Sequence, residues 1–232
     1  MRKLVIGIFM IFSFTSMASA ELGVNIGISG NLAVFAADAS ETTKENKMAV
    51  AGTNVQTEKE DETAVAGYTS IFIEKTLGFL PGPLSRLSVG FDHVPSGLSS
   101  DTTENAQVDL DAGGIKSASK LNKVQVEFND LNTLYLTAQV TDNLYVKLGK
   151  VSVDLQTNES LATGSKYADT SLDGSMYGIG YNRELGPLFL RLEGTMMDLG
   201  GASLTSSTNA ENSVKMNNLE GASAKFSIGK SF

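Results

Sequence analysis

The sequence predicts an all-β fold, an up-and-down antiparallel transmembrane β-barrel of eight strands. Three observations lead to this prediction. Apolar residues recur at every second position in eight segments, which is the period of a strand with one apolar face. The connections between these segments are alternately long and short. The last segment ends on an aromatic residue, Phe232, in phase with its apolar face.

The first twenty residues are expected to be removed before folding. Two basic residues precede an apolar run at 4–14, and Met-Ala-Ser-Ala at 17–20 offers the small residues of a cleavage site. This order is typical of a secretory signal peptide. The run is too short to span a bilayer as a helix. We therefore expect a signal peptide at 1–20 and an exported barrel at 21–232.

Composition excludes several classes of function. The chain has no cysteine, so it has neither disulfides nor a thiolate metal site. Its 26 acidic residues exceed its 18 basic ones, which argues against nucleic acid as a partner because phosphates require a basic face. The sequence contains no P-loop, no dinucleotide-binding glycine motif and no zinc-protease motif. No cofactor and no metal site are therefore expected.

The first four predicted strands cover 22–34, 65–77, 84–94 and 123–140. The first is the clearest, since Leu22, Val24, Ile26 and Ile28 alternate with glycine, asparagine and serine. In the fourth, the alternation is interrupted near Asp130, and the membrane part is expected after this point. The lengths suit tilted membrane strands of about 9–11 residues with extensions.

The last four predicted strands cover 144–155, 177–181, 188–196 and 219–232. In the first of these, Leu144, Val146 and Leu148 share one face, but beyond Lys150 the apolar residues change to the other parity. This change indicates a bulge or the departure of the strand from the bilayer. The remaining three strands alternate regularly.

Four long polar connections are expected, at 37–64, 95–122, 156–174 and 199–217, with short turns at 78–83, 141–143 and 184–187. Long loops on one side and short turns on the other are typical of bacterial outer-membrane barrels. A further hairpin within 108–120 would make ten strands. A soluble eight-stranded barrel would also alternate, but its interior would be apolar, whereas here the second face of the strands is polar.

The end of the chain resembles the terminal insertion signal of outer-membrane barrels. That signal places a final aromatic on a strand with apolar residues at alternate positions, here Ala224, Phe226, Ile228 and Phe232. Lys230 departs from the pattern, although its side chain can extend toward lipid headgroups. The layout of the whole chain resembles the small OmpA, OmpX and OmpW class of barrels. The resemblance implies a monomer in the outer membrane of a Gram-negative bacterium, in contact with lipid, lipopolysaccharide and the barrel-assembly machinery.

Charged residues on the second face of the strands form the candidate functional site. Four are acidic and four are basic, so the two sets balance. They are Glu74, Arg86, Asp92, Glu127, Lys147, Arg191, Glu193 and Lys225. The interior of an eight-stranded barrel is only wide enough for side chains, and buried charges require partners. We therefore expect a polar network that fills the interior, and the alternative is a narrow path for small solutes or ions.

His93 is the chain's one histidine, and it raises the alternative of a lipid-modifying enzyme. Asp92 and Ser96 are close to it in sequence. However, Asp92 should point to the opposite face of the strand because neighbouring side chains alternate. The His-x-Ser arrangement of lipid A deacylases, which this sequence would have to match, is also absent. The sequence therefore favours a non-enzymatic envelope protein with a structural or surface-interaction role.

Overall fold

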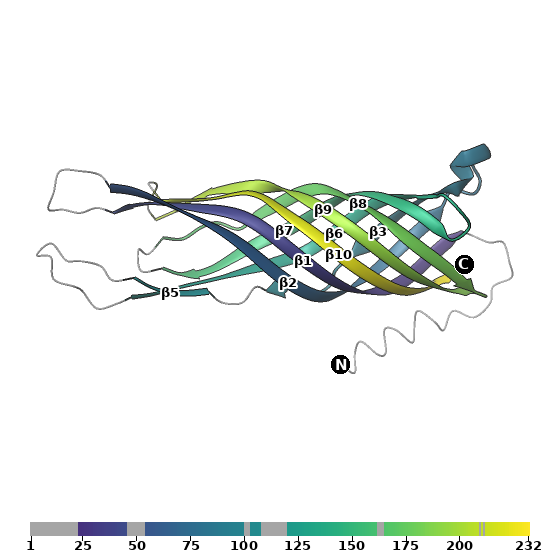
Figure 1. Ribbon diagram of the computed structural model, residues 1–232, viewed down its shortest axis with the longest axis horizontal. Helices are drawn as coiled ribbons and strands as arrows, with labels where there is room; N and C mark the ends of the chain where they lie inside the picture. The colour runs from purple at the N-terminus through teal and green to yellow at the C-terminus, as the bar shows by residue number, and fades with distance from the viewer. Residues whose placement is uncertain are drawn as a thin grey trace, which may run out of the picture.

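The strands form one antiparallel sheet that curls into an elongated barrel (Figure 1). The computed structural model describes residues 23–45, 54–99, 103–107, 120–161, 165–208, 210 and 212–232. The predicted signal peptide and residues 108–119 of the additional hairpin lie outside them. The strands are β1 (Val24–Glu45), β2 (Asn54–Thr76), β3 (Leu87–His93), β4 (Leu98–Ser99), β5 (Thr103–Gln107), β6 (Lys120–Gln139), β7 (Leu144–Ser160), β8 (Thr170–Leu185), β9 (Leu188–Thr205) and β10 (Ser213–Ser231).

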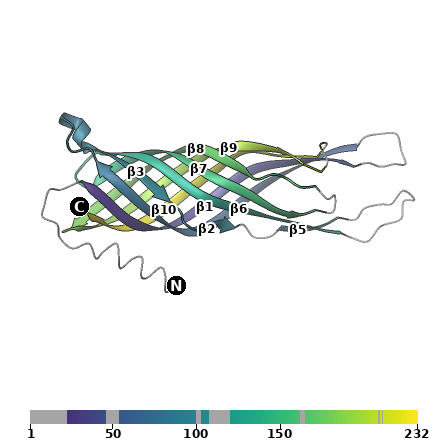
Figure 2. The same cartoon turned by 180° about the vertical axis from the view of Figure 1, so that it is seen from behind.

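The ring closes with eight strands, as predicted. β3, β4 and β5 pair with β6 one after another, so these three pieces occupy a single place in the barrel wall and the ten strands count as eight. The ring is completed by pairing of β3 with both β2 and β6, and of β1 with both β2 and β10. The C-terminus and the 3-10 helix η1 (Gly82–Arg86) lie at the end with the short turns (Figures 1 and 2).

An apolar belt surrounds the part of the barrel nearest the short turns. Its side chains point outward and stay exposed, among them Leu134, Leu148 and Ile179, which are 58%, 61% and 60% exposed. Residues between them along the strands point inward. Such a belt is unfavourable in water and favourable in hydrocarbon, so the observed alternation matches a transmembrane barrel. Among the described residues, no helix is long and apolar enough to cross a membrane.

Beyond the belt, the strands are much longer than predicted. β1 and β2 stay paired through the whole stretch from Ala37↔Glu62 to Glu45↔Asn54, and this stretch was predicted to be loop. β8 and β10 likewise begin before their predicted starts. The polar composition of these stretches concealed the strands. Outside the bilayer, water tolerates polar side chains on both faces, so the ladder can continue where the apolar alternation ends.

The long strands invert their polarity where they leave the belt. On β7, Leu144, Val146 and Leu148 point outward, whereas Val151 and Val153 point inward. β7 pairs with β8 without a register shift across this point, so no bulge causes the change. The parity change predicted from the sequence therefore marks the departure of the strand from the bilayer. In water the favourable arrangement is the ordinary one, with the apolar face inside.

An apolar cluster fills the interior beyond the belt. Buried side chains of the five strands β6 to β10 and of the segment after β3 contribute to it, and Leu172, Val151 and Leu199 are nearly inaccessible. Phe35, Phe128 and Met216 pack against it. This cluster acts as a conventional hydrophobic core and closes the loop-side end of the lumen.

Interior aromatic rings lie against glycines of the neighbouring strand. The directly paired positions are Phe72↔Gly27, Phe189↔Gly229, Tyr135↔Gly90 and Tyr145↔Gly180. A Cβ atom added at Gly180 would lie 2.2 Å from the Tyr145 ring. The glycines therefore make room for large side chains in a narrow barrel, which is a known device in curved sheets.

Replacing Gly180 with alanine should lower the free energy of unfolding by about 1–3 kcal/mol, the usual cost of overpacking a core. The Tyr145 ring cannot move away easily because it is buried beside Arg191. Gly194 provides the matched control, since an added Cβ there would meet nothing within 4 Å. Denaturant titrations of the two variants in detergent would test this, and equal midpoints would contradict the steric argument.

Candidate functional site: the barrel lumen

Three buried ion pairs cross the lumen inside the apolar belt. Glu74 of β2 pairs with Arg191 of β9, Lys147 of β7 with Glu193 of β9, and Lys225 of β10 with Asp92 of β3. All six side chains are buried. Because no two partners sit on adjacent strands, each pair ties together non-neighbouring parts of the wall. The six charges cancel, as a low-dielectric interior requires.

Arg191 is the centre of the first pair. Its guanidinium donates two hydrogen bonds to the Glu74 carboxylate, at 3.0 and 2.7 Å, and a third to Asn182 Oδ1 at 3.1 Å. The planar group also lies over the Phe189 ring, 4.6 Å from its centroid. Asn25 donates to the same carboxylate at 3.1 Å. This bidentate, ring-flanked arrangement leaves little of either charge uncompensated.

The other two pairs hold lysines. Lys147 Nζ donates to Glu193 at 3.0 Å and lies 3.9 Å from the centroid of the Tyr135 ring, in cation–π geometry. Lys225 donates to Asp92. Between the pairs, hydroxyl side chains bond to each other, such as Ser29 with Ser227 at 2.8 Å. The lumen at belt level is therefore filled by a hydrogen-bonded network.

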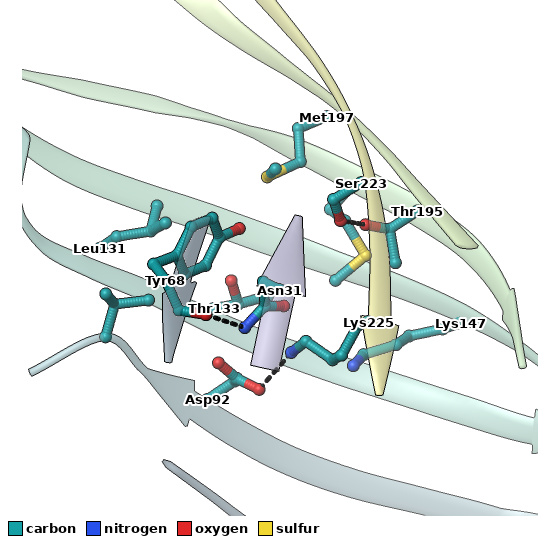
Figure 3. A pocket seen from close by; sticks show the side chains of 12 residues that line it. Asn31, Tyr68, Asp92, Leu131, Thr133, Lys147, Thr195, Met197, Ser223 and Lys225 are labelled. Carbon is teal, nitrogen blue, oxygen red and sulfur yellow. Dashed lines mark hydrogen bonds and ion pairs between the residues drawn. The ribbon is translucent and has the colours of Figure 1, made fainter. Parts of the chain in front are cut away.

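A small internal cavity separates the ion pairs from the apolar cluster (Figure 3). It has a volume of about 30 Å³, and its walls include Lys147, Lys225 and Asp92 on one side and Leu131 and Met197 on the other. This is more than the roughly 10–15 Å³ that one water molecule requires. The cavity can therefore hold water beside the ion pairs.

On the outer side of the barrel, the connections after β7 and after β9 bind each other. The backbone N–H of Ser207 donates to the Lys166 carbonyl at 2.8 Å, and Asn212 donates to Ser165 at 2.9 Å. Asn212 and Ser165 are both buried. The half-buried Tyr167 follows, and burial, reinforced by the carboxylate of Glu41, raises its pKa to about 12. The Tyr167 phenol is therefore neutral at physiological pH, beside Glu41 of β1.

No protein-family model matches the chain, and no curated protein matches it either. Similar solved structures include the outer membrane protein OprG from Pseudomonas aeruginosa, at 14% identity and a TM-score of 0.42, which covers 91% of this chain and 97% of that one. The outer membrane protease OmpT from Escherichia coli has 9% identity and a TM-score of 0.39, covering 95% and 100%. Ail, the attachment invasion locus protein of Yersinia pestis, has 10% identity and a TM-score of 0.35, covering 89% and 99%.

The geometry of the barrel itself decides its class. Apolar side chains surround the outside, whereas ion pairs occupy the inside at the same level, and this polarity is favourable only for a barrel embedded in lipid. The protein is a transmembrane β-barrel. Its short turns and its C-terminus lie at one end and its long extensions at the other, which matches the periplasmic and external sides of such barrels (Figure 2).

Two predicted interior residues lie outside the lumen of this transmembrane barrel. Arg86 is exposed in η1, because the segment predicted as the start of the third strand belongs to this 3-10 helix, which begins at Gly82. Glu127 precedes a bulge in β6, where Asp130 takes a positive φ of 50°. The bulge reverses the inward parity, so Phe128 and not Glu127 faces the core. Glu127 accepts a hydrogen bond from Asn158 at 2.9 Å instead.

Aromatic residues also line the lumen. Phe72, Tyr135, Tyr145 and Phe189 are all buried there and flank the charged groups. Strand parity places Phe72, Tyr145 and Phe189 on the same faces as Glu74, Lys147 and Arg191. The opposition of each ring to a glycine on the next strand becomes visible only when the strand register is known.

The C-terminal residues of the predicted insertion signal occupy the end of β10. Phe226 and Ala224 point outward into the belt, and Ile228 is half-buried. The Phe232 N–H donates to the Val24 carbonyl at 2.9 Å, so β1 and β10 are joined to the last residue. Lys230 Nζ lies 4.7 Å from the centroid of the Phe232 ring. The lysine that departs from the pattern therefore packs on the terminal aromatic.

Proposed function

We propose that this outer-membrane barrel is a non-conducting, non-enzymatic envelope protein with a structural or surface-interaction role. The observation that carries the proposal is the filled lumen. Three ion pairs occupy the belt level, and an apolar cluster lies beyond them. A solute would have to break both layers to pass.

The alternative, a porin-like passive channel, finds less support in the same residues. A conducting lumen requires charges that face water, whereas all six lumenal charges are buried and paired. Moving an ion through the apolar cluster around Leu172 and Leu199 would also require its desolvation. An ion path needs a hydrated route and accessible charges. The packing of the lumen opposes both.

Planar-bilayer recording of the refolded protein tests the proposal. We expect the wild-type barrel to stay silent at salt concentrations and voltages at which a general porin, used as the control, conducts steadily. A steady conductance that decreases in Arg191→Gln or Lys147→Gln would overturn the proposal and establish the channel, because these side chains would then line the conducting path.

The surroundings of His93 support a non-enzymatic role. Its Nδ1 lies 2.8 Å from Asn132 Oδ1, in an outward position at the edge of the belt. Asp92 points into the lumen and binds Lys225, so it cannot act together with the imidazole. Ser96 is exposed in the segment after β3. In the part of the chain that the structure describes, no group of three histidine, cysteine, aspartate or glutamate residues could hold a metal ion.

The partners follow from the two ends of the molecule. Lipid and lipopolysaccharide would surround the belt. The barrel-assembly machinery would recognise the terminal strand with Ala224, Phe226, Ile228 and Phe232. Because the ring at belt level is completed within one chain, a monomer is sufficient for insertion. The extended strands on the outer side would then present a surface to the environment of the cell.

A further inference from the structure

One edge of the barrel wall has no partner among the described residues. β2 pairs with β1 along nearly its whole length, from Asn54 to Lys75. On its other side, it pairs with β3 only from Ile71 to Thr76. In the described part of the chain, no strand pairs with this second edge of β2 between Asn54 and Ser70. We call this stretch the open edge.

The open edge arises because the third barrel strand turns away from β2. After His93, the Val94 N–H donates to the Leu131 carbonyl of β6 at 3.0 Å, and the Val94 side chain enters the apolar cluster. Pro95 follows, which has no N–H to donate. β4 and β5 then continue along β6 alone. In both ribbon views, the ends of the β1–β2 pair and of the β5–β6 pair diverge (Figures 1 and 2).

The open edge is long and regular. At about 3.3 Å per residue, its seventeen residues extend over roughly 55 Å. Proteins often guard such edges with proline, bulges or charged side chains, especially lysine. Here the edge contains no proline, a single lysine, Lys59, and no register shift against β1. Long, regular edges can act as templates for a further strand.

The charge of the open edge distinguishes between two possible occupants, a basic strand of another protein and a second copy of this edge. Within the open edge lies the sequence Glu58-Lys59-Glu60-Asp61-Glu62, with four acidic residues and one basic residue. Two acidic residues of β1 stand directly opposite two of these, in the pairs Asp38↔Asp61 and Glu41↔Glu58. Like charges in directly opposed positions are unfavourable. A basic strand would relieve this repulsion, whereas a second copy of the same edge would increase it.

We propose that the open edge of β2 binds an extended, cationic polypeptide segment of a partner protein by strand addition. Backbone hydrogen bonds to β2 would supply the affinity, and the acidic residues would select a basic sequence. The inference deepens the surface-interaction role proposed above and rests on it. It assigns the interaction to one edge and gives the partner a chemistry.

The experiment uses the full-length mature chain in phosphatidylcholine nanodiscs, whose lipids carry no net charge. The probe is a fluorescent ten-residue peptide that alternates lysine with valine, and its binding is followed by anisotropy. The control is the same peptide with every second amide N-methylated, which keeps the charge and removes backbone donors. We expect saturable binding of the first peptide and at least tenfold weaker binding of the second.

Protein variants and hydrogen exchange locate the binding. The triple variant Glu58→Gln, Glu60→Gln, Glu62→Gln should weaken binding at least tenfold. The matched control, Asp154→Asn, Asp173→Asn, Asp198→Asn, removes three exposed carboxylates from strands that are paired on both sides, and should bind as the wild type does. Exchange protection induced by the peptide should be confined to residues 54–70.

Several results would overturn the proposal. Equal binding of the N-methylated peptide would show attraction by charge alone, and protection outside 54–70 would place the site elsewhere. Amides of 54–70 that are already protected without peptide, or a dimer that forms through this edge, would identify another occupant. These outcomes leave the bilayer recording unaffected, so failure of this inference is distinguishable from failure of the non-conducting role.

Discussion

Replacing Glu74 with alanine should lower the free energy of unfolding by about 3–5 kcal/mol, the cost of breaking a buried ion pair by removing one partner. The Arg191 guanidinium would lose both of its short hydrogen bonds to the carboxylate and stay buried between aromatic rings. Because the chain has no tryptophan, urea titration in detergent would be followed by gel mobility or circular dichroism.

Two further variants make this result interpretable. Glu184→Ala removes an exposed carboxylate at the end of β8 and should leave the midpoint unchanged. The double variant Glu74→Leu, Arg191→Met replaces both charges with apolar groups and should recover most of the loss, because no unpaired charge remains. If Glu74→Ala unfolds at the wild-type midpoint, the guanidinium is reached by water and the filled-lumen description is incorrect.

Replacing Leu172 with alanine should cost about 2–5 kcal/mol, as is usual for a large-to-small change in a packed core. Leu172 is 2% exposed and belongs to the apolar cluster beyond the belt. The rigid barrel wall limits how far its neighbours can move to fill the space left behind. The same denaturant titration measures the effect.

Leu148→Ala is the matched control for this second prediction. The same residue type is replaced, but Leu148 faces outward and is 61% exposed, so lipid or detergent tails can fill the vacated volume. Its midpoint should shift far less than that of Leu172→Ala. Equal losses for the two leucines would indicate that the cluster is loosely packed and that the lumen can open.

The membrane-embedded half of the fold was predictable because the solvent imposes a period. Leu144, Val146 and Leu148 must face lipid, and this requirement leaves a two-residue repeat in the sequence. The extensions of β1 and β2 beyond Ala37 were not predictable in the same way. In water, a strand whose consecutive residues Asp61 and Glu62 are both acidic has no apolar repeat, and only pairing with its neighbour reveals it.

The lumenal charges were predictable to the extent that strand parity held. Lys147, Arg191 and Glu193 lie on regular strands, and they point inward as alternation requires. Glu127 was misplaced because the bulge at Asp130 inserts one residue, which no single-sequence repeat reports. Which acid meets which base also could not be predicted, because Glu74 and Arg191 are 117 residues apart and meet only through ring closure.

The abrupt change of outward residues at the end of the belt has a consequence for the membrane around the protein. Leu148 is followed two positions later by Lys150, and Met196 by Asp198. If the barrel moved along the bilayer normal by two residues in one direction, these charged groups would enter the acyl chains. If it moved by the same distance in the other direction, Leu148 would lose its contact with lipid. The protein therefore has one favourable depth in the bilayer. Where the bilayer thickness differs from the height of the apolar belt, the lipid must stretch or thin to match the belt.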